Sequence, residues 1–151
     1  MFDTEKEMSI NFERYFKQNF GNAYIKEYQG LFGVPDYICY QKKGNDISII
    51  AFELKLKNWK TASKQAFRYK SFSDVAYVVL PKNLISTALK NIEYFKKYNI
   101  GLALFSNEKE LNIIYKPNPS EPYSENLKLK IRNSVQSSRK KIKNIETLID
   151  Y

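Results

Sequence analysis

Residues 47–57, ISIIAFELKLK, form the clearest strand pattern in the chain, and the rest of the fold is predicted around them. Because side chains alternate across a strand, one face carries four apolar residues, Ile50, Phe52, Leu54 and Leu56. The other face carries Ile49, Ala51, Glu53 and Lys55. Both faces begin apolar, which is typical of a central strand covered on both sides. Charge on a covered face costs free energy unless a metal or a substrate needs it.

The sequence around this strand predicts alternating helices and strands. Met8, Phe12, Phe16 and Phe20 recur every four residues and predict a helix over about 5–20. Strands are expected over 24–29, 36–41, 75–80, 100–105 and 111–115, and further helices over about 58–72 and 84–98. This alternation predicts an α/β fold with a mixed central sheet flanked by helices, formed by residues 1–122.

The composition fits one folded domain outside the membrane. A chain of 151 residues with 43% hydrophobic and 15% aromatic content is long enough to bury a core. No apolar run approaches the ~20 residues that cross a bilayer. The first residues are acidic and lack the apolar block of a signal peptide. With Cys39 as the one cysteine, we expect a cytoplasmic protein in which this residue is a small packed hydrophobe.

The chain contains no histidine, and this excludes several mechanisms. A Ser-His-Asp or Cys-His nucleophile cannot be built, nor can a zinc site of the usual imidazole kind. Carboxylate and metal chemistry remains for hydrolysis, with lysine as the available cation.

The net charge of +9 predicts a polyanionic partner, and nucleic acid is the expected one. The distribution of the charge is more informative than its sum. Residues 126–143 contain no acid and seven bases: Lys128, Lys130, Arg132, Arg139, Lys140, Lys141 and Lys143. Such a run is a good electrostatic footprint for a phosphate backbone.

The C-terminal region, residues 123–151, predicts an amphipathic helix with a basic face. Its apolar seam alternates spacings of four and three: Ile131, Val135, Ser138, Ile142, Ile145 and Ile149. We expect the seam to pack on residues 1–122, since about two heptads are few for an autonomous coiled coil. A homodimer contact through this helix is the alternative.

Three short segments carry the side chains on which a reaction would depend. Asp36 begins one predicted strand, and Glu53 and Lys55 lie two residues apart on the same face of the next. Gln65 and Tyr69 follow one helical turn apart. Phosphodiester hydrolysis needs an activated water and neutralisation of charge on the phosphate, and Mg²⁺ held by carboxylates supplies both.

The chain resembles the PD-(D/E)XK nuclease superfamily in three motifs: Pro35-Asp36, Glu53-Leu54-Lys55 and Gln65-Ala66-Phe67-Arg68-Tyr69. The third is similar to the glutamine–hydrophobic–x–x–tyrosine motif of the RecB-like branch. The resemblance covers about residues 5–80. It implies a restriction-endonuclease-like αβββαβ core, to which the basic C-terminal helix is added, and a metal-dependent nuclease with DNA as the expected substrate.

The resemblance also implies a role for each residue of the motifs. It assigns catalysis to Asp36, Glu53, Lys55, Gln65 and Tyr69. The metal, Mg²⁺ with Mn²⁺ as a substitute, would be bound by Asp36 and Glu53 together with the backbone carbonyl of Leu54. Lys55 would orient the attacking water or stabilise the pentavalent state. The glutamine and the tyrosine would support this lysine and the DNA.

Members of the superfamily often add an acid from the first helix. Glu13 is the preferred candidate because it lies beside the apolar stripe, and Glu5, Glu7 and Glu27 compete with it. Candidate phosphate contacts are Lys57, Lys60, Arg68, Arg139, Lys140 and Lys141. One cysteine excludes the iron–sulfur cluster that related exonucleases often carry. In size the chain is similar to Holliday-junction resolvases and compact restriction-type enzymes.

Two alternatives remain open at the level of the sequence. One is a catalytically silent nucleic-acid-binding module on a nuclease-like fold, because fold alone does not fix function. The other is an interaction subunit whose isoleucine seam pairs with a partner or with a second copy. The sequence does not distinguish cleavage within a strand from cleavage at an end.

Overall fold

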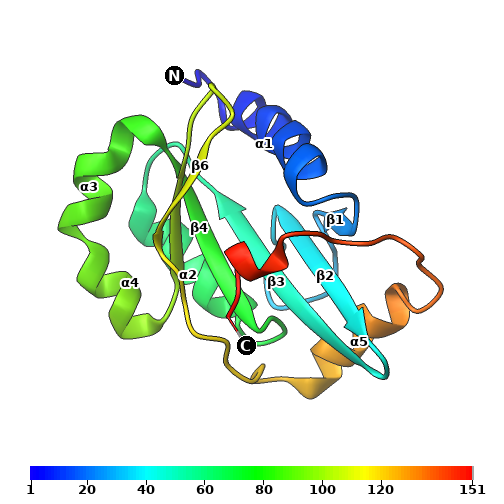
Figure 1. The fold of residues 1–151 in the computed structure, drawn as a ribbon. Coiled ribbons are helices and arrows are strands. Elements are labelled where there is room, and N and C mark those ends of the chain that lie inside the picture. The colour runs from blue at the N-terminus through cyan, green and yellow to red at the C-terminus, as the bar shows by residue number, and fades with distance from the viewer. Residues whose placement is uncertain (151) are drawn as a thin grey trace.

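A six-stranded mixed sheet forms the centre of the structure, a computed structural model that describes residues 1–150 (Figure 1). The strands are β1 (Tyr24–Lys26), β2 (Tyr37–Lys43), β3 (Asp46–Leu54), β4 (Val75–Pro81), β5 (Gly101–Phe105) and β6 (Leu111–Tyr115). They lie side by side in chain order. Strands β1, β2 and β3 are antiparallel, β3, β4 and β5 are parallel, and β6 is antiparallel to β5.

Helices cover both faces of this sheet. They are α1 (Glu5–Asn19), α2 (Trp59–Tyr69), α3 (Ile85–Lys90), α4 (Ile92–Tyr98) and α5 (Glu125–Ser134), with single 3₁₀ turns at Lys82–Leu84 and Ile145–Thr147. Helix α1 and the C-terminal residues pack on one face, and α2, α4 and α5 pack on the other (Figure 1). The predicted α/β class is confirmed. From α1 to β4 the elements follow the predicted order of helix, three strands, helix and strand.

Helix α1 forms where the four-residue apolar spacing predicted it. It begins after Thr4, whose hydroxyl accepts a hydrogen bond from the backbone N–H of Glu7 at 3.0 Å. Its buried residues are Met8, Phe12 and Phe16. The Phe12 ring lies 5.5 Å from the ring of Phe52 on β3, centroid to centroid. The helix therefore packs its apolar stripe directly on the central strand.

Strand β3 is covered on both faces, as its alternating apolar pattern predicted. All of its residues after Asp46 are buried. Ile50, Phe52 and Leu54 belong to the core beneath α1, and Ile49 and Ala51 belong to the core beneath α2. Glu53 is the next residue on the face that carries Ile49 and Ala51. It is 5% exposed and faces the α2 layer.

The helix predicted over residues 84–98 is divided into α3 and α4 at Asn91. The side-chain amide of Asn91 donates a hydrogen bond to the backbone carbonyl of Thr87 at 2.8 Å. Local side-chain bonds of this kind compete with the regular helical ladder. The apolar spacing predicted the extent of this region but not its break.

The helix predicted over residues 123–151 was wrong beyond Ser134, where α5 ends. The Lys42 side chain reaches across and donates hydrogen bonds to the carbonyls of Val135, Gln136 and Ser138, at 3.2, 3.0 and 2.6 Å. These bonds satisfy carbonyl groups that a continued helix would have paired internally. Further along, Ile142 forms an isolated antiparallel bridge with Gly21.

The apolar residues of the C-terminal region pack on their own chain, as expected. Ile131 and Val135 join the core on the α2 face, whereas Ile145, Leu148 and Ile149 join the core on the α1 face. The chain thus crosses from one layer to the other around the edge of the sheet next to β1 and β2. The side chains considered for a dimer contact are largely buried within the protein itself.

None of the helices within residues 1–150 is long and apolar enough to cross a membrane. Cys39 is fully buried in the core beneath α1, and burial raises the pKa of its thiol. Its expected role as a small packed hydrophobe is confirmed.

Candidate active site

Asp36 and Glu53 lie beside each other at one end of the antiparallel β2–β3 pair. Tyr37 is paired with Phe52, and Asp36 and Glu53 are the residues that flank this pair in the sequence. The backbone N–H of Asp36 donates to the Phe52 carbonyl at 3.1 Å. In return, the Asp36 carboxylate accepts a 2.7 Å hydrogen bond from the backbone N–H of Leu54. Strand pairing therefore fixes Asp36 against the Glu53-Leu54-Lys55 motif.

Tyr69 connects this end of the sheet to helix α2. Its hydroxyl donates to Oε1 of Glu53 at 2.6 Å and also lies 3.0 Å from the backbone carbonyl of Val34. Gly33, which has φ +84°, lies against the tyrosine ring, and a Cβ at this position would be 2.9 Å from it. The loop before Asp36 and the helix after Glu53 are thus tied together by one buried side chain.

Burial is the main influence on both carboxyl groups. It raises the pKa of Asp36 to about 6, although the hydrogen bond from the Leu54 N–H acts in the opposite direction. It raises the pKa of Glu53 to about 8, and repulsion from Asp36 adds to this increase. The Tyr69 hydroxyl lowers the pKa of Glu53, but not enough to offset burial. Two neighbouring carboxyl groups that resist ionisation form a site that is stabilised by a cation.

Lys55 provides one positive charge near this pair. The side chain is half-buried, and its backbone N–H donates to the Val79 carbonyl at 3.0 Å, which extends the pairing of β3 with β4. Its ammonium group lowers the pKa of both Asp36 and Glu53, against the larger effect of burial. Within residues 1–150 it forms no ion pair with an acidic side chain. It influences the carboxylates while remaining available to a substrate.

Gln65 lies one helical turn before Tyr69 on α2. Its Oε1 atom is buried and accepts no hydrogen bond from the described part of the chain. An unsatisfied buried acceptor costs roughly 1–3 kcal/mol. A hydrogen-bond donor on a ligand or substrate would satisfy this atom.

The structure brings Glu5 to the carboxylate pair. Its carboxylate accepts a 3.3 Å hydrogen bond from the backbone N–H of Leu56, just beyond β3. Besides burial, the negative charge of Glu5 raises the pKa of both Asp36 and Glu53. Glu5 was a secondary candidate in the sequence because apolar spacing shows which face of a helix is buried but not which turn reaches the sheet.

Glu13, the preferred acid of the first helix, is engaged elsewhere. Its carboxylate accepts hydrogen bonds from the Tyr24 hydroxyl at 2.6 Å and from the Lys26 ammonium group at 3.0 Å. Burial acts to raise the pKa of Glu13, but these two bonds lower it overall. Its role as a metal ligand stays a prediction.

A groove between α1 and the ends of β1 and β2 is shared by Glu5, Glu13 and Asp36. It encloses about 400 Å³ and is lined by Glu5, Lys6, Ser9, Ile10, Glu13, Lys26, Glu27, Asp36 and Tyr37. Glu27 adopts a left-handed conformation, with φ 50°, and its backbone N–H donates to the Asp36 carbonyl at 3.1 Å. Asp36 is therefore the member of the carboxylate pair that lines the groove.

The candidate phosphate contacts fall into two groups. Lys57, Lys60 and Arg68 are exposed at or near α2. Arg139, Lys140 and Lys141 line a hollow of 430 Å³ near Tyr40 and Lys42 on β2. Because a strand rises about 3.3 Å per residue, that hollow begins roughly 13–20 Å from Asp36 along β2. The structure therefore does not bring the C-terminal bases to the carboxylate pair.

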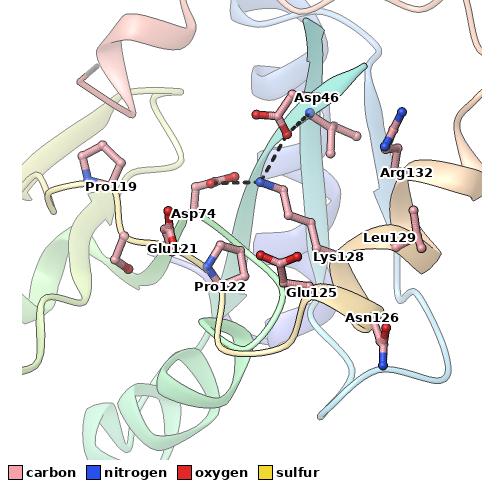
Figure 2. A pocket seen from close by; sticks show the side chains of 12 residues that line it. Asp46, Asp74, Pro119, Glu121, Pro122, Glu125, Asn126, Lys128, Leu129 and Arg132 are labelled. Carbon is pink, nitrogen blue, oxygen red and sulfur yellow. Dashed lines mark hydrogen bonds and ion pairs between the residues drawn. The ribbon is translucent and has the colours of Figure 1, made fainter. Parts of the chain in front are cut away.

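A cavity larger than this groove lies elsewhere. It encloses 570 Å³ between the first residues of β3 and helix α5 (Figure 2). Lys128 projects into it, with its ammonium nitrogen 3.3 Å from Asp74 and 3.7 Å from Asp46 (Figure 2). Lys128 therefore pairs with two of the acids that line this cavity, and none of the three sequence motifs contributes to its lining.

Within residues 1–150, no three histidine, cysteine or acidic side chains are grouped closely enough to form a ready metal-binding cluster. The donors at the carboxylate pair are nevertheless hard oxygen atoms, the type that Mg²⁺ prefers. No family model matches the chain, and no curated protein or solved structure matches it.

Proposed function

We propose that the protein is a metal-dependent nuclease that hydrolyses phosphodiester bonds, with DNA as its substrate. The observation that carries this proposal is the placement of Asp36 beside Glu53, with Lys55 acting electrostatically on both. The motif resemblance to PD-(D/E)XK nucleases supports it. The observed order of helix, three strands, helix and strand is consistent with the core of that superfamily.

Asp36 and Glu53 would hold Mg²⁺ or Mn²⁺, with the Leu54 carbonyl as a further donor. When bound, such an ion activates a water and neutralises charge on the phosphate. The raised pKa of both carboxyl groups fits this role, because a divalent cation compensates the repulsion that now opposes their ionisation. Glu5 lies close enough to complete the acidic surroundings, and we prefer it to Glu13 for this purpose.

The remaining site residues have separate tasks in this proposal. Tyr69 holds Glu53 in one orientation through its 2.6 Å hydrogen bond. Lys55 stabilises negative charge on the phosphate or orients the attacking water. Gln65 offers an unpaired acceptor to a donor that arrives with the substrate or to the lysine ammonium group. These tasks require a preorganised set of side chains, which the strand and helix anchors provide.

The charge of the molecule supports a nucleic-acid substrate. Lys57, Lys60 and Arg68 are exposed at or near α2, the helix that carries Gln65 and Tyr69, and suit phosphate contacts. The bases of residues 139–143 extend the positive surface toward the far end of β2. Backbone contacts of this type fix the position of a substrate without selecting its sequence.

The experiment that tests the proposal is a cleavage assay on labelled single-stranded, duplex and branched DNA with Mg²⁺, Mn²⁺ or EDTA. The wild type is compared with Lys55→Met and with Lys64→Met, a control that removes the same charge from an exposed position on α2. We expect metal-dependent cleavage by the wild type and the control, and its loss in Lys55→Met. A Lys55→Met protein that cleaves at the wild-type rate would refute the assigned mechanism.

A silent nucleic-acid-binding module is the second candidate. One observation favours it: both carboxylates already accept hydrogen bonds from the protein. The same assay separates the two. Binding without cleavage on every substrate and with every metal supports the silent module.

A further inference from the structure

The loop of residues 30–34, which precedes the Pro35-Asp36 motif, is anchored at both ends. The Gly30 carbonyl accepts a 3.0 Å hydrogen bond from the Lys130 side chain on α5. The Val34 carbonyl lies 3.0 Å from the hydroxyl of Tyr69 on α2. Two helices far apart in the sequence therefore fix the path of this loop.

The interior of the loop is anchored as well. Leu31 packs against the core on the α2 face, and Gly33 lies against the Tyr69 ring. Between them Phe32 turns outward and is 54% exposed, and Val34 is 43% exposed. Single exposed apolar side chains are ordinary on protein surfaces. An aromatic ring presented by a loop with this many anchors is a more specific arrangement.

Arg68 completes the surface of this loop. Its guanidinium carbon lies 5.6 Å from the centre of the Phe32 ring, within the range of a cation–π contact. Arg68 directly precedes Tyr69, whose hydroxyl binds Glu53. Phe32 lies four residues before Asp36 in the chain. The exposed ring and its arginine are therefore carried by the loop before Asp36 and by helix α2, the two segments that Tyr69 joins to Glu53.

Building on the proposed nuclease function, we infer that Phe32 stacks on an unpaired base next to the scissile phosphate, while Arg68 contacts the adjoining backbone. In a continuous duplex the faces of the bases are covered by their neighbours, so an aromatic side chain can stack only on a base that has left the helix. The substrate class is then single-stranded DNA, including the single-stranded part of a flap or of a frayed end. Base–aromatic stacking is sequence-tolerant, because every base has a π-face.

The test measures binding in EDTA, so that it does not depend on cleavage. Fluorescence anisotropy gives the affinity for a labelled single-stranded oligonucleotide and for its duplex. We compare the wild type with Phe32→Ala, Phe32→Trp and the control Phe67→Ala. Phe67 is a suitable control because it is 40% exposed on α2 but packs edge-on against Tyr98, with 6.1 Å between ring centroids.

We expect Phe32→Ala to weaken single-strand binding by about 5- to 150-fold, the loss typical of one stacked base. Duplex binding should be unchanged, Phe32→Trp should retain single-strand affinity, and Phe67→Ala should resemble the wild type. A 2-aminopurine base in the strand should change its fluorescence on binding to the wild type but not to Phe32→Ala. Thermal unfolding by circular dichroism verifies that the variants are folded.

Three outcomes would overturn the inference. These are unchanged single-strand affinity in Phe32→Ala, an equal loss on single strand and duplex, or an equal loss in Phe67→Ala. The cleavage assay keeps this result separate from the nuclease proposal. Metal-dependent cleavage that does not depend on Phe32 would support the proposed nuclease function and contradict the proposed base contact. A Phe32-dependent preference for single strands without cleavage supports the contact on a silent module.

Discussion

The Tyr69 hydroxyl donates a 2.6 Å hydrogen bond to Oε1 of Glu53, across sixteen residues of sequence and between a helix and a strand. Both side chains are buried, so the bond replaces water that neither group retains. The phenol also lies against Gly33 and the Val34 carbonyl, which places it between the loop before Asp36 and the strand that carries Glu53. Tyr69 is therefore a positioning residue for both halves of the carboxylate pair.

The first prediction concerns this bond. In Tyr69→Phe the ring remains but Glu53 loses the donor that lowers its pKa, so the carboxylate becomes harder to ionise. Hydrogen bonds to charged groups contribute about 1.5–3 kcal/mol, so we expect about 10- to 150-fold weaker activation by Mg²⁺. The measurement is cleavage rate as a function of Mg²⁺ concentration.

The matched control for this variant is Tyr40→Phe. Tyr40 is also buried and its hydroxyl is 2.8 Å from Ser138, but it lies in the middle of β2, four residues beyond Asp36. We expect an unchanged dependence on Mg²⁺ in this control. Equal effects in the two variants would mean that Tyr69 acts only on the stability of the fold.

The second prediction concerns the close approach at Gly33. In Gly33→Ala the new methyl group would lie 2.9 Å from the Tyr69 ring, at a residue whose φ is +84°. Left-handed backbone alone costs an L-residue roughly 1–2 kcal/mol, and the contact adds to that cost. Gly44→Ala separates the two effects, because Gly44 has φ +59° and nothing within 4 Å of its added Cβ. Urea unfolding should show a greater loss for Gly33→Ala, and equal losses would contradict the contact.

The fold was largely predictable because its strongest patterns are local. The alternation over 47–57 gives a strand covered on both sides, and the four-residue spacing of Phe12 and Phe16 gives a helix that packs on it. Each pattern depends on the geometry of one element alone. The tertiary contacts in the structure agree with the secondary structure that each local pattern predicts.

The C-terminal region shows where this reasoning fails. Its three- and four-residue apolar spacing predicted one helix, yet Ile131 and Ile149 are buried on opposite faces of the sheet. The helix ends where the Lys42 side chain donates hydrogen bonds to the carbonyls of Val135 and Ser138. That lysine is more than ninety residues away in the chain, and no local pattern contains it.

The candidate site was predictable in its motifs but not in its surroundings. Asp36, Glu53 and Tyr69 were proposed from their residue types and spacing, and the structure brings them together. The contact of Glu5 with Leu56 depends on how α1 approaches the sheet. Phe32 had no signal in the sequence, because its exposure follows from the anchors of its loop.

The third prediction tests the C-terminal residues. Leu148 is fully buried in the core on the α1 face, and its carbonyl accepts a 2.6 Å hydrogen bond from the Tyr77 hydroxyl. Leu148→Ala leaves the backbone bond in place but creates a cavity, which costs about 2–5 kcal/mol. Leu129→Ala, at a position 46% exposed on α5, should change the free energy of unfolding by less than about 0.5 kcal/mol. Similar values for the two variants in denaturant unfolding would contradict the packing of this region.

The fourth prediction is a pH dependence of stability in the absence of metal. The pKa of Glu53 in the folded protein is about 8, against an ordinary value of 4.5. The folded state therefore binds the Glu53 proton more tightly than the unfolded state does. The stability contributed by the protonated group is fully present at pH values below the ordinary pKa of 4.5. This contribution decreases as pH rises from about 4.5 to about 8, by on the order of 1–4 kcal/mol.

Glu53→Gln isolates this effect, because the amide resembles the protonated acid in shape and carries no charge at any pH. In EDTA we expect the variant and the wild type to be similarly stable near about pH 4.5, and the variant to be the more stable near about pH 9. Excess Mg²⁺ should then raise the melting temperature of the wild type at the higher pH and leave that of Glu53→Gln unchanged, because a ligand stabilises only the state that binds it. A wild type whose stability in EDTA does not fall over this interval would show that Glu53 ionises normally. The carboxylate pair would then not need a cation to offset unfavourable ionisation. The proposed metal site depends on that need.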